Sequence, residues 1–519
     1  MNSNVTYEKS EETKNGVARL VVTIIAILLE VLLIVGLFLW LSQYAEWIAI
    51  GSRILAAILV LSIYSQEKTS SMKTPWIILI MIVPVVGTVL YIMIGINYFT
   101  RTMKKRYEEV DRILFSLLPD DRGTIDELEK RDKGAANIAK YIHNYGFYPT
   151  YHDSDIEYYS EAADGLEAQK AELRKAKKFI FMEYHAIENA ESWHGIQEIL
   201  EEKVKEGVEV RVFYDDMGSI GFINTDFVKR MTARGIRCRV FNPFIPGLNL
   251  FLNNRDHRKI TVVDGLVGFT GGYNLANEYF GLTEPYGKWK DTGVKITGQA
   301  VKSLTVAFLE NWNAIRGDDD NDTDFLQYLP DTGHQQEEDS FIIPYADIPM
   351  DKEQMGENVY MSVAEYARDY VWFITPYLIL TDEMTHVLGL AAKRGVDVRV
   401  ITPGIPDKKL VYSITRSYYH SLVKNGVRVY EYTPGFCHCK MCVADDKVAT
   451  CGTINLDYRS LYHHFENGCL YYGCKAVSDT RKDFEDIMAV SEEVTEKYLD
   501  NKMWIKSKHV ILRLIAPLM

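Results

Sequence analysis

The chain has 519 residues, 47% of them hydrophobic, and its formal net charge at pH 7 is -13. This length allows more than one domain, and the acidic balance excludes broad nucleic-acid binding, which needs a basic surface. The seven cysteines, six of them in the last third of the chain, do not form the framework of a small secreted domain. We therefore expect free thiols on the cytosolic side of a membrane.

The first 110 residues are predicted to form a membrane region. Apolar runs cover residues 20–39, 47–64 and 75–96, and the third is interrupted by Pro84 and Gly87. The first run is long enough to span a bilayer. If the third run bends back at its interruption, all flanking clusters of lysine and arginine lie on the inner side. We therefore expect two spans plus a broken third segment, with the large domain cytoplasmic; three full spans are the alternative.

Beyond residue 110, two halves of the chain resemble each other. The matching segments are KAKKFIFMEY (175–184) with ARDYVWFITPY (367–377), and KEGVEVRVFYDD (205–216) with KRGVDVRVITPG (393–404). Each half alternates short β-branched runs with amphipathic helical patterns, which predicts an α/β fold. We expect duplicated lobes, each a mixed, largely parallel sheet flanked by helices.

The boundaries follow from composition. The first lobe is predicted at 111–325 and the second at 326–519. We interpret the acidic, turn-rich stretch 316–340 as a solvated linker between the lobes rather than a metal site. The last residues, 502–519, mix basic and apolar side chains, which fits either a tail lying on an anionic membrane or one docked on the protein core.

Each predicted lobe carries the same motif, H-x-K-x4-D-x6-G-x-x-N. Its members are His257, Lys259, Asp264, Gly271 and Asn274 in the first lobe and His438, Lys440, Asp445, Gly452 and Asn455 in the second. A single short motif arises by chance, but two copies at equivalent places in a repeat indicate a functional pair. Residues i and i+2 of a strand share a face, so each histidine and its lysine are expected to point together.

This set of side chains suits a phosphodiester. The lysines would neutralise phosphate oxygens, one neutral histidine would attack phosphorus, and the other would protonate the leaving oxygen. Asn274 and Asn455 are candidate phosphate donors, with turn capping as the alternative. An acid is needed to fix the tautomer of a nucleophilic histidine, and Asp291 and Glu466 are the candidates for orienting the histidines.

The motif aspartates Asp264 and Asp445 follow their histidines by seven residues. They belong to the candidate catalytic motif, but the odd spacing places them on the opposite face of a continuous strand. We interpret them as supporting or structural groups of the site.

The segment FCHCKMCVADDKVATCGTIN (436–455) holds four of the cysteines. His438, Lys440 and Cys442 would share one face of a strand, with Cys437 and Cys439 on the other. Such thiols cannot converge on one ion in an unbroken strand. We expect no metal site here, and small apolar side chains packing around the motif.

The chain resembles the phospholipase D superfamily, and within it the bacterial cardiolipin synthases. The segments that carry the resemblance include NNRDHRKITVVDGLVGFTGGYNLANEY, WKDTG, GFCHCKMCVAD and GTINLDYRSLYHHFE. Two departures are Asn277, where the family more often has Asp, and Thr453, where Ser is commoner. The resemblance covers nearly the whole chain.

The resemblance implies a membrane-bound phosphatidyl transferase without a cofactor. Two molecules of phosphatidylglycerol would give cardiolipin and glycerol through a phosphohistidine, with His257 as nucleophile and His438 as acid and base. The expected partners are phosphatidylglycerol and the lipid bilayer, with no nucleic acid. A phospholipase D-type hydrolase, or a synthase using another alcohol acceptor, is the alternative. A non-catalytic scaffold is disfavoured because both motifs are complete.

Overall fold

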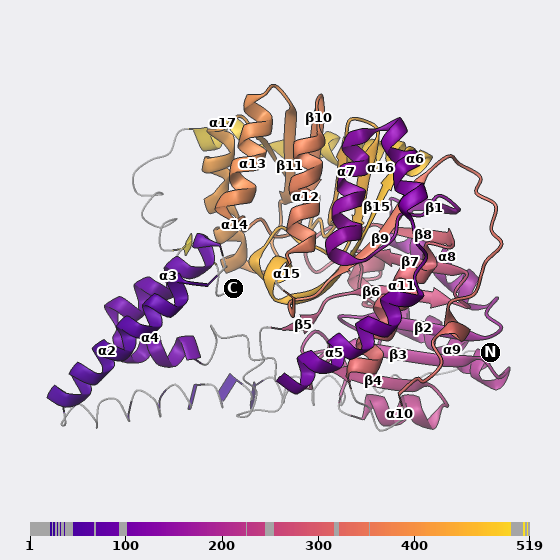
Figure 1. Cartoon of the computed structure of the whole chain (residues 1–519), viewed down its shortest axis with the longest axis horizontal. Coiled ribbons are helices and arrows are strands. Elements are labelled where there is room, and N and C mark those ends of the chain that lie inside the picture. Colours follow the sequence, from indigo (N-terminus) through magenta and orange to yellow (C-terminus); the bar gives the residue numbers. More distant parts are fainter. Residues whose placement is uncertain are drawn as a thin grey trace.

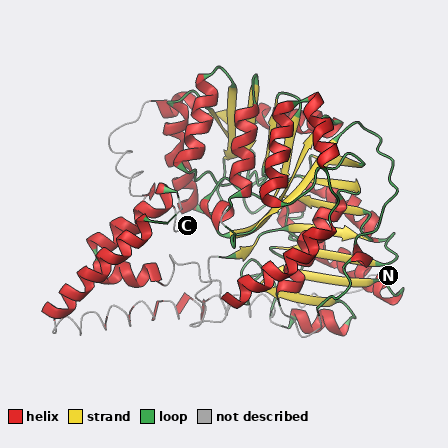
Figure 2. Ribbon diagram, viewed as in Figure 1, coloured by secondary structure: helices red, strands yellow, loops and turns green. Residues whose placement is uncertain are grey.

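The structure is a computed structural model of the chain. It describes residues 45–66, 69–92, 101–224, 226–243, 254–315, 321–351 and 353–499, with scattered positions within 21–36 and 512–516. Two β-sheets, each covered by helices, form the main body, and an arm of helices projects from one side of it (Figure 1). In Figure 2, the strands of the second sheet lie above the strands of the first sheet.

The two sheets have the same strand order. The first runs β1-β8-β7-β6-β2-β3-β4, and the second runs β9-β15-β14-β13-β10-β11-β12, with β16 paired to β12 and β5 paired to β15. The strands of the first are β1 (Ser154–Tyr159), β2 (Phe179–Tyr184), β3 (Glu209–Asp215), β4 (Arg237–Phe241), β6 (Lys259–Val263), β7 (Val267–Gly271) and β8 (Gly293–Gly298). Those of the second are β9 (Phe341–Asp347), β10 (Tyr370–Ile374), β11 (Asp397–Pro403), β12 (Arg428–Tyr432), β13 (Met441–Ala444), β14 (Val448–Gly452), β15 (His464–Tyr472), β16 (Ser491–Glu493) and β5 (Arg255–Asp256).

Helices cover both faces of each sheet. In the first lobe, α8 (Ala162–Leu173), α9 (Glu191–Lys205) and α10 (Phe227–Ala233) share one apolar core with β2 and β3. The buried helix α11 (Val301–Ala314) lies in the core on the other face, and this core continues into the second lobe. The second lobe has α12 (Met355–Tyr366), α13 (Asp382–Lys393), α14 (Lys409–Val423), α15 (Tyr458–Tyr462), α16 (Lys475–Ala489) and α17 (Thr495–Leu499).

The mixed α/β character is confirmed, but the expectation of largely parallel sheets is wrong. In the first lobe only β2–β3 and β3–β4 pair in parallel, and the other neighbours pair antiparallel. Parallel neighbours need a long crossover, which α9 and α10 provide. The strands that follow each motif histidine are instead joined by a short turn, at 264–266 in the first lobe, so they form an antiparallel hairpin.

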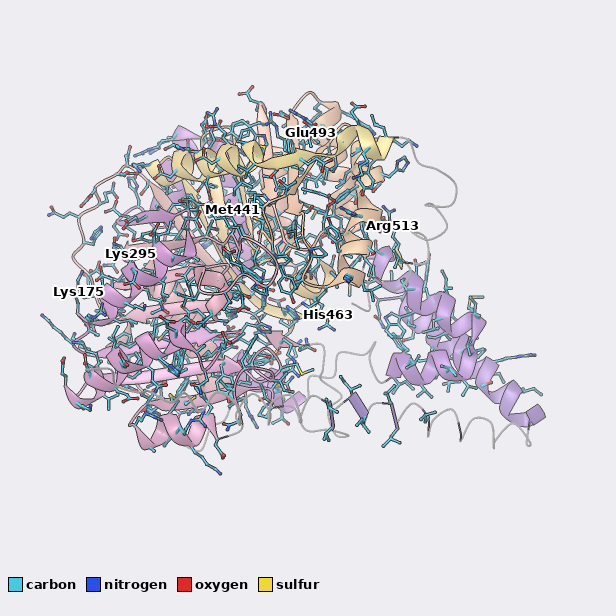
Figure 3. The ribbon with its side chains drawn as sticks, turned by 180° about the vertical axis from the view of Figure 1, so that it is seen from behind. Lys175, Lys295, Met441, His463, Glu493 and Arg513 are labelled. Atoms are coloured by element: carbon cyan, nitrogen blue, oxygen red, sulfur yellow. The ribbon has the colours of Figure 1, made fainter. Side chains whose placement is uncertain are left out.

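The lobes are joined through the backbone as well as through the core. Strand β15 of the second lobe pairs in parallel with β5, which lies just before His257 in the chain. A second bridge links Lys290 to Cys437. Met441, labelled near the middle of the molecule in Figure 3, accepts a hydrogen bond from the Tyr158 hydroxyl at 3.3 Å, across the lobe boundary. The interface therefore runs directly beside both motifs.

Six α-helices lie in the described part of residues 45–141. They are α2 (Ala45–Tyr64), α3 (Ser70–Ile82), α4 (Pro84–Leu90), α5 (Arg101–Leu114), α6 (Arg122–Arg131) and α7 (Lys133–Tyr141). Helices α2 to α4 make the projecting arm, with a small core of their own. A Cβ atom on Gly87 would lie 2.7 Å from the Ile80 backbone, so the glycine lets α4 fold back closely against α3.

The predicted third apolar run is thus broken, since α3 ends at Ile82 and Pro84 begins α4. Proline fits the first turn of a helix because no N–H is needed there. The predicted run 20–39 lies largely outside the described residues, as does the tail 502–519. Within the described ranges, none of the helices combines enough length and apolar character to cross a bilayer.

Candidate active site

The two motif histidines face one cavity between the lobes. His257 precedes β6 and His438 precedes β13, and only 7% and 6% of their surfaces are exposed. The cavity has a volume of about 580 Å³, and Asn274 and Asn455 also line it. The duplicated chain therefore builds a single site, to which each lobe contributes a histidine and an asparagine.

Each histidine contacts a carboxylate from the other lobe. His257 Nδ1 lies 2.9 Å from Glu466 Oε2, and His438 Nδ1 lies 2.7 Å from Asp291 Oδ2. The backbone places these pairs: the His257 N–H donates to the Phe465 carbonyl at 2.8 Å, and the His438 N–H donates to the Lys290 carbonyl at 2.7 Å. Each acid is therefore the next residue after the one whose carbonyl accepts the backbone hydrogen bond from the histidine of the other lobe.

Each motif lysine contacts the backbone carbonyl of its own histidine. Lys259 Nζ donates to the His257 carbonyl at 2.6 Å. Lys440 Nζ donates to the His438 carbonyl and lies 2.6 Å from His438 Nδ1 and 3.0 Å from Nε2. Both lysines are 1% exposed. Two buried ammonium groups therefore stand next to the imidazoles, which is the charge that a phosphate anion requires.

Burial controls the protonation of the site. Desolvation, together with the neighbouring lysines, holds the pKa of His257 and that of His438 well below the ordinary value. Desolvation lowers the pKa of Lys259 to about 7 and raises the pKa of Asp291 to about 7. At neutral pH both imidazoles are consequently unprotonated, as a nucleophile must be.

The asparagines occupy equivalent places but have different partners. Asn274 accepts from the Ala186 N–H at 3.2 Å and donates to the Tyr279 hydroxyl at 2.8 Å. In the described part of the structure, Asn455 Oδ1 is buried without a hydrogen-bond partner. Asn274 is therefore tied to the cavity wall, whereas the Asn455 amide keeps an unused polar atom at the site.

The motif aspartates lie away from the cavity. The Asp264 carboxylate accepts backbone N–H groups of Lys177, Lys178 and Phe179 at 2.7–2.9 Å. Asp445 accepts those of residues 368–370 in the same way. Both aspartates have positive φ, 54° and 52°, so each forms the hairpin turn and ties it to the start of a neighbouring strand. Both carboxylates therefore bind backbone amides outside the cavity, in line with the interpretation of these two residues of the catalytic motif as supporting or structural groups.

The residue two positions before each motif asparagine contacts one of the two acids: Gly272 lies beside Asp291, and Thr453 binds Glu466. A Cβ on Gly272 would lie 2.1 Å from Asp291 Oδ1, so only glycine leaves space for that carboxylate. At the equivalent place in the second lobe, the Thr453 hydroxyl donates to Glu466 Oε2. The hydroxyl thus fixes the carboxylate that contacts His257.

The cysteines around His438 are buried free thiols. Cys437 Sγ lies 3.7 Å from Cys439 Sγ, while Cys442 Sγ lies 3.1 Å from the Thr450 hydroxyl. Thus Cys437 and Cys439 pack together, and Cys442 turns to another neighbour. Their contacts are those of small side chains filling the wall around the motif.

Sequence reasoning missed several residues of the cavity. Histidines His185 and His464 flank His257, with ring centroids 4.9 and 5.4 Å away. Tyr279 and Trp289 flank His438 at 5.2 and 5.5 Å. The sequences FMEYHAIEN and HHFEN contain both extra histidines, but nothing in their spacing indicates that they meet at His257.

Fold and site together define a two-lobed, phospholipase D-type protein with paired His-Lys motifs. A family model described as "Cardiolipin synthase, PLD-like domain" matches residues 361–488, and "Phospholipase_D-nuclease N-terminal" matches residues 54–95. Among solved structures, phosphatidylserine synthase from Haemophilus influenzae is 14% identical with a TM-score of 0.55, covering 75% of this chain and 99% of its own. That likeness supports the fold.

Curated relatives narrow the class. Cardiolipin synthase from Staphylococcus aureus is 30% identical over 91% of this chain and 96% of its own length. The major cardiolipin synthase ClsA of Bacillus subtilis is 29% identical over 90% and 97%. An uncharacterised protein of Streptococcus mutans is 41% identical over 88% and 98%. The chain belongs to the cardiolipin synthase family of phospholipase D-like proteins.

Proposed function

We propose that this protein condenses two molecules of phosphatidylglycerol into cardiolipin and glycerol. Family membership supports the substrate and product. The observation that carries the chemistry is the crossed pairing of His257 with Glu466 and of His438 with Asp291 around one cavity. A site with two oriented imidazoles, one acting as nucleophile and the other as proton carrier, can transfer a phosphatidyl group in two steps.

In the first step, His257 attacks phosphorus of the donor lipid. The Glu466 carboxylate holds Nδ1–H, which leaves the Nε2 lone pair free to form the P–N bond. The negative charge of the bound phosphate favours the protonated form of His438. As the bond from phosphorus to the glycerol oxygen breaks, this imidazolium delivers its proton to that oxygen and glycerol leaves. Lys259 and Lys440 stabilise the negative charge of the phosphoryl oxygens, which requires their protonated forms.

In the second step, the primary hydroxyl of the acceptor phosphatidylglycerol attacks the phosphohistidine. His438, now unprotonated, takes the hydroxyl proton while the P–N bond breaks and His257 is released. Atoms balance with one cardiolipin and one glycerol formed. Attack by water in place of the lipid hydroxyl would give phosphatidic acid instead, so the acceptor decides between synthase and hydrolase.

A product assay tests the overall reaction. The purified full-length protein is incubated in detergent micelles with phosphatidylglycerol labelled in its acyl chains and in its headgroup glycerol. We expect cardiolipin and free glycerol in equal amounts, and neither from a His257→Asn, His438→Asn double variant. Phosphatidic acid without cardiolipin would establish a hydrolase, and a product with another added alcohol would establish a different acceptor.

The order of the histidines is tested with a lipid whose leaving group is p-nitrophenol. This leaving group needs no acid, so a variant that lacks only the acid and base still forms the covalent intermediate. We expect His438→Asn to release a burst of one equivalent of p-nitrophenol per site, and His257→Asn to release none. The reverse pattern would exchange the two roles.

We further propose that residues 1–110 hold the protein in the bacterial cell membrane as a multi-pass region, ahead of lobes at 111–325 and 326–519, with the catalytic domain cytoplasmic. The match at 54–95 supports this placement, as do the outward-facing Ile58, Leu61 and Ile82, which are 59–73% exposed. Helix α3 also adjoins the catalytic body, since Asp382 N donates to the Ser71 hydroxyl at 3.3 Å.

Extraction of membranes with alkaline carbonate tests the anchor. The protein is expected to stay in the membrane pellet, and an engineered C-terminal protease site is expected to be cleaved only when the cytoplasmic face is accessible. Release of the full-length protein into the supernatant would contradict the multi-pass anchor, and cleavage from outside would contradict the cytoplasmic orientation.

A further inference from the structure

His464 is a cavity histidine that the proposed reaction leaves unused. Its side chain is 10% exposed, and it lines the same cavity as His257. In the described part of the structure, neither of its ring nitrogens has a hydrogen-bond partner. It is the residue after His463, which Figure 3 labels on the side of the body nearest the helical arm. Burying an imidazole without a partner is costly, so this position calls for an explanation.

The neighbour of His464 is the acid that also holds His257. His464 Nδ1 lies 3.5 Å from Glu466 Oε1, while Glu466 Oε2 lies 2.9 Å from His257 Nδ1. Oxygen Oε1 of Glu466 is itself buried without a hydrogen-bond partner. One carboxylate therefore stands between two imidazoles, with an unused oxygen on the side of His464.

These three residues have the geometry of a metal site. One ligand atom from each of His257, His464 and Glu466 lies within 4.8 Å of the others. Zinc bonds of about 2.0–2.1 Å in a tetrahedron separate ligand atoms by roughly 3.3 Å, and the three ligand atoms here all lie within 4.8 Å of one another, one from each residue. Two histidines and one glutamate supply three ligands and leave a fourth position for water, as in known zinc sites of this ligand type, and both histidines line the cavity.

We propose that His257, His464 and Glu466 bind a divalent transition-metal ion of the Zn²⁺ type, and that this ion inhibits the enzyme. Metal binding does not depend on the proposed reaction, whereas inhibition rests on it. The ion takes the His257 imidazole and its carboxylate out of the arrangement that attacks phosphorus. Imidazole ligands select Zn²⁺, Ni²⁺ and Cu²⁺ over Mg²⁺ and Ca²⁺, which prefer oxygen. The ammonium groups of Lys259 and Lys440 oppose the ion and weaken its binding.

Direct binding is measured on chelator-treated full-length protein by calorimetry with ZnCl₂ and by absorption with Co²⁺. We expect one ion per chain and at least a tenfold loss of affinity in His464→Asn, since even residues behind metal ligands contribute about 10–100-fold. His185→Asn is the matched control. His185 lines the same cavity beside His257, but its Nδ1 contacts the Asp256 carbonyl at 2.7 Å. Its zinc affinity is expected to stay within threefold of wild type.

Inhibition is measured as the zinc concentration that halves the metal-free rate of each variant, with MgCl₂ as the ionic control. We expect this concentration to rise at least tenfold in His464→Asn and to be unchanged in His185→Asn. His257→Gln, a second variant at another ligand, is expected to lose zinc affinity to the same extent. Wild-type affinity in either folded ligand variant overturns the proposal, as does thiolate-to-cobalt absorption, which would assign the ion to the cysteines.

Discussion

The crossed pairing predicts which acid serves which histidine. Replacing Glu466 by Gln keeps the shape of the side chain but removes its charge beside His257. A hydrogen bond to a charged group contributes about 1.5–3 kcal/mol, and the charge stabilises the developing imidazolium by roughly 3–4 kcal/mol at an effective dielectric constant of 20 and 4–5 Å. These terms overlap, so we expect a loss of about 3–4 kcal/mol, or a rate decrease of about 10²–10³.

The assay is the pre-steady-state burst of p-nitrophenol from the activated lipid. Glu466→Gln is expected to slow the burst by about 10²-fold or more, because Glu466 lies 2.9 Å from His257. Asp291→Asn is expected to leave the burst within about fivefold and to slow turnover instead, since Asp291 contacts His438. The surface variant Glu493→Gln serves as a control for loss of a carboxylate. If Asp291→Asn slows the burst and Glu466→Gln does not, each acid serves the histidine of its own lobe and the reasoning is refuted.

Three further predictions concern stability, space and pH. Asp264→Ala is expected to lower the free energy of unfolding by about 3 kcal/mol, because three backbone N–H groups lose their acceptor. The kcat of the folded enzyme is expected to stay within about threefold of wild type. A wild-type melting temperature would contradict this prediction. Gly272→Ala is expected to displace Asp291 and lower kcat by about 10–100-fold, whereas Gly123→Ala, where a Cβ meets nothing within 4 Å, is expected to be neutral in the same assay. Asp291 loses its charge as pH falls through its pKa of about 7, and Lys259 loses its charge as pH rises through its pKa of about 7. We therefore expect kcat/KM to peak near neutrality and Asp291→Asn to remove the acid limb; an unchanged profile would argue against this assignment.

The duplicated α/β organisation could be read from the sequence because local patterns carry it. Short β-branched runs and amphipathic stretches recur in both halves, and the motif spacing recurs with them. The parallel character was overestimated because the hairpins after His257 and His438 read as further β-branched runs. The direction of strand pairing depends on whether the connection is a tight turn or a crossover helix. The alternation of side chains within one strand does not record which connection follows it.

For the site, the sequence alone predicted the two His-Lys pairs and the asparagines, which stand at repeated spacings, and the two acids, which follow the histidines at comparable distances. It also indicated, by strand parity, that Asp264 and Asp445 point elsewhere. Only the tertiary structure decided that each acid contacts the histidine of the opposite lobe, and that His464 joins His257 at Glu466. The reason is physical: β15 pairs with β5, and Lys290 with Cys437, across the lobe interface. Contacts between residues about 150–210 positions apart depend on how two folded lobes dock, which no local periodicity records.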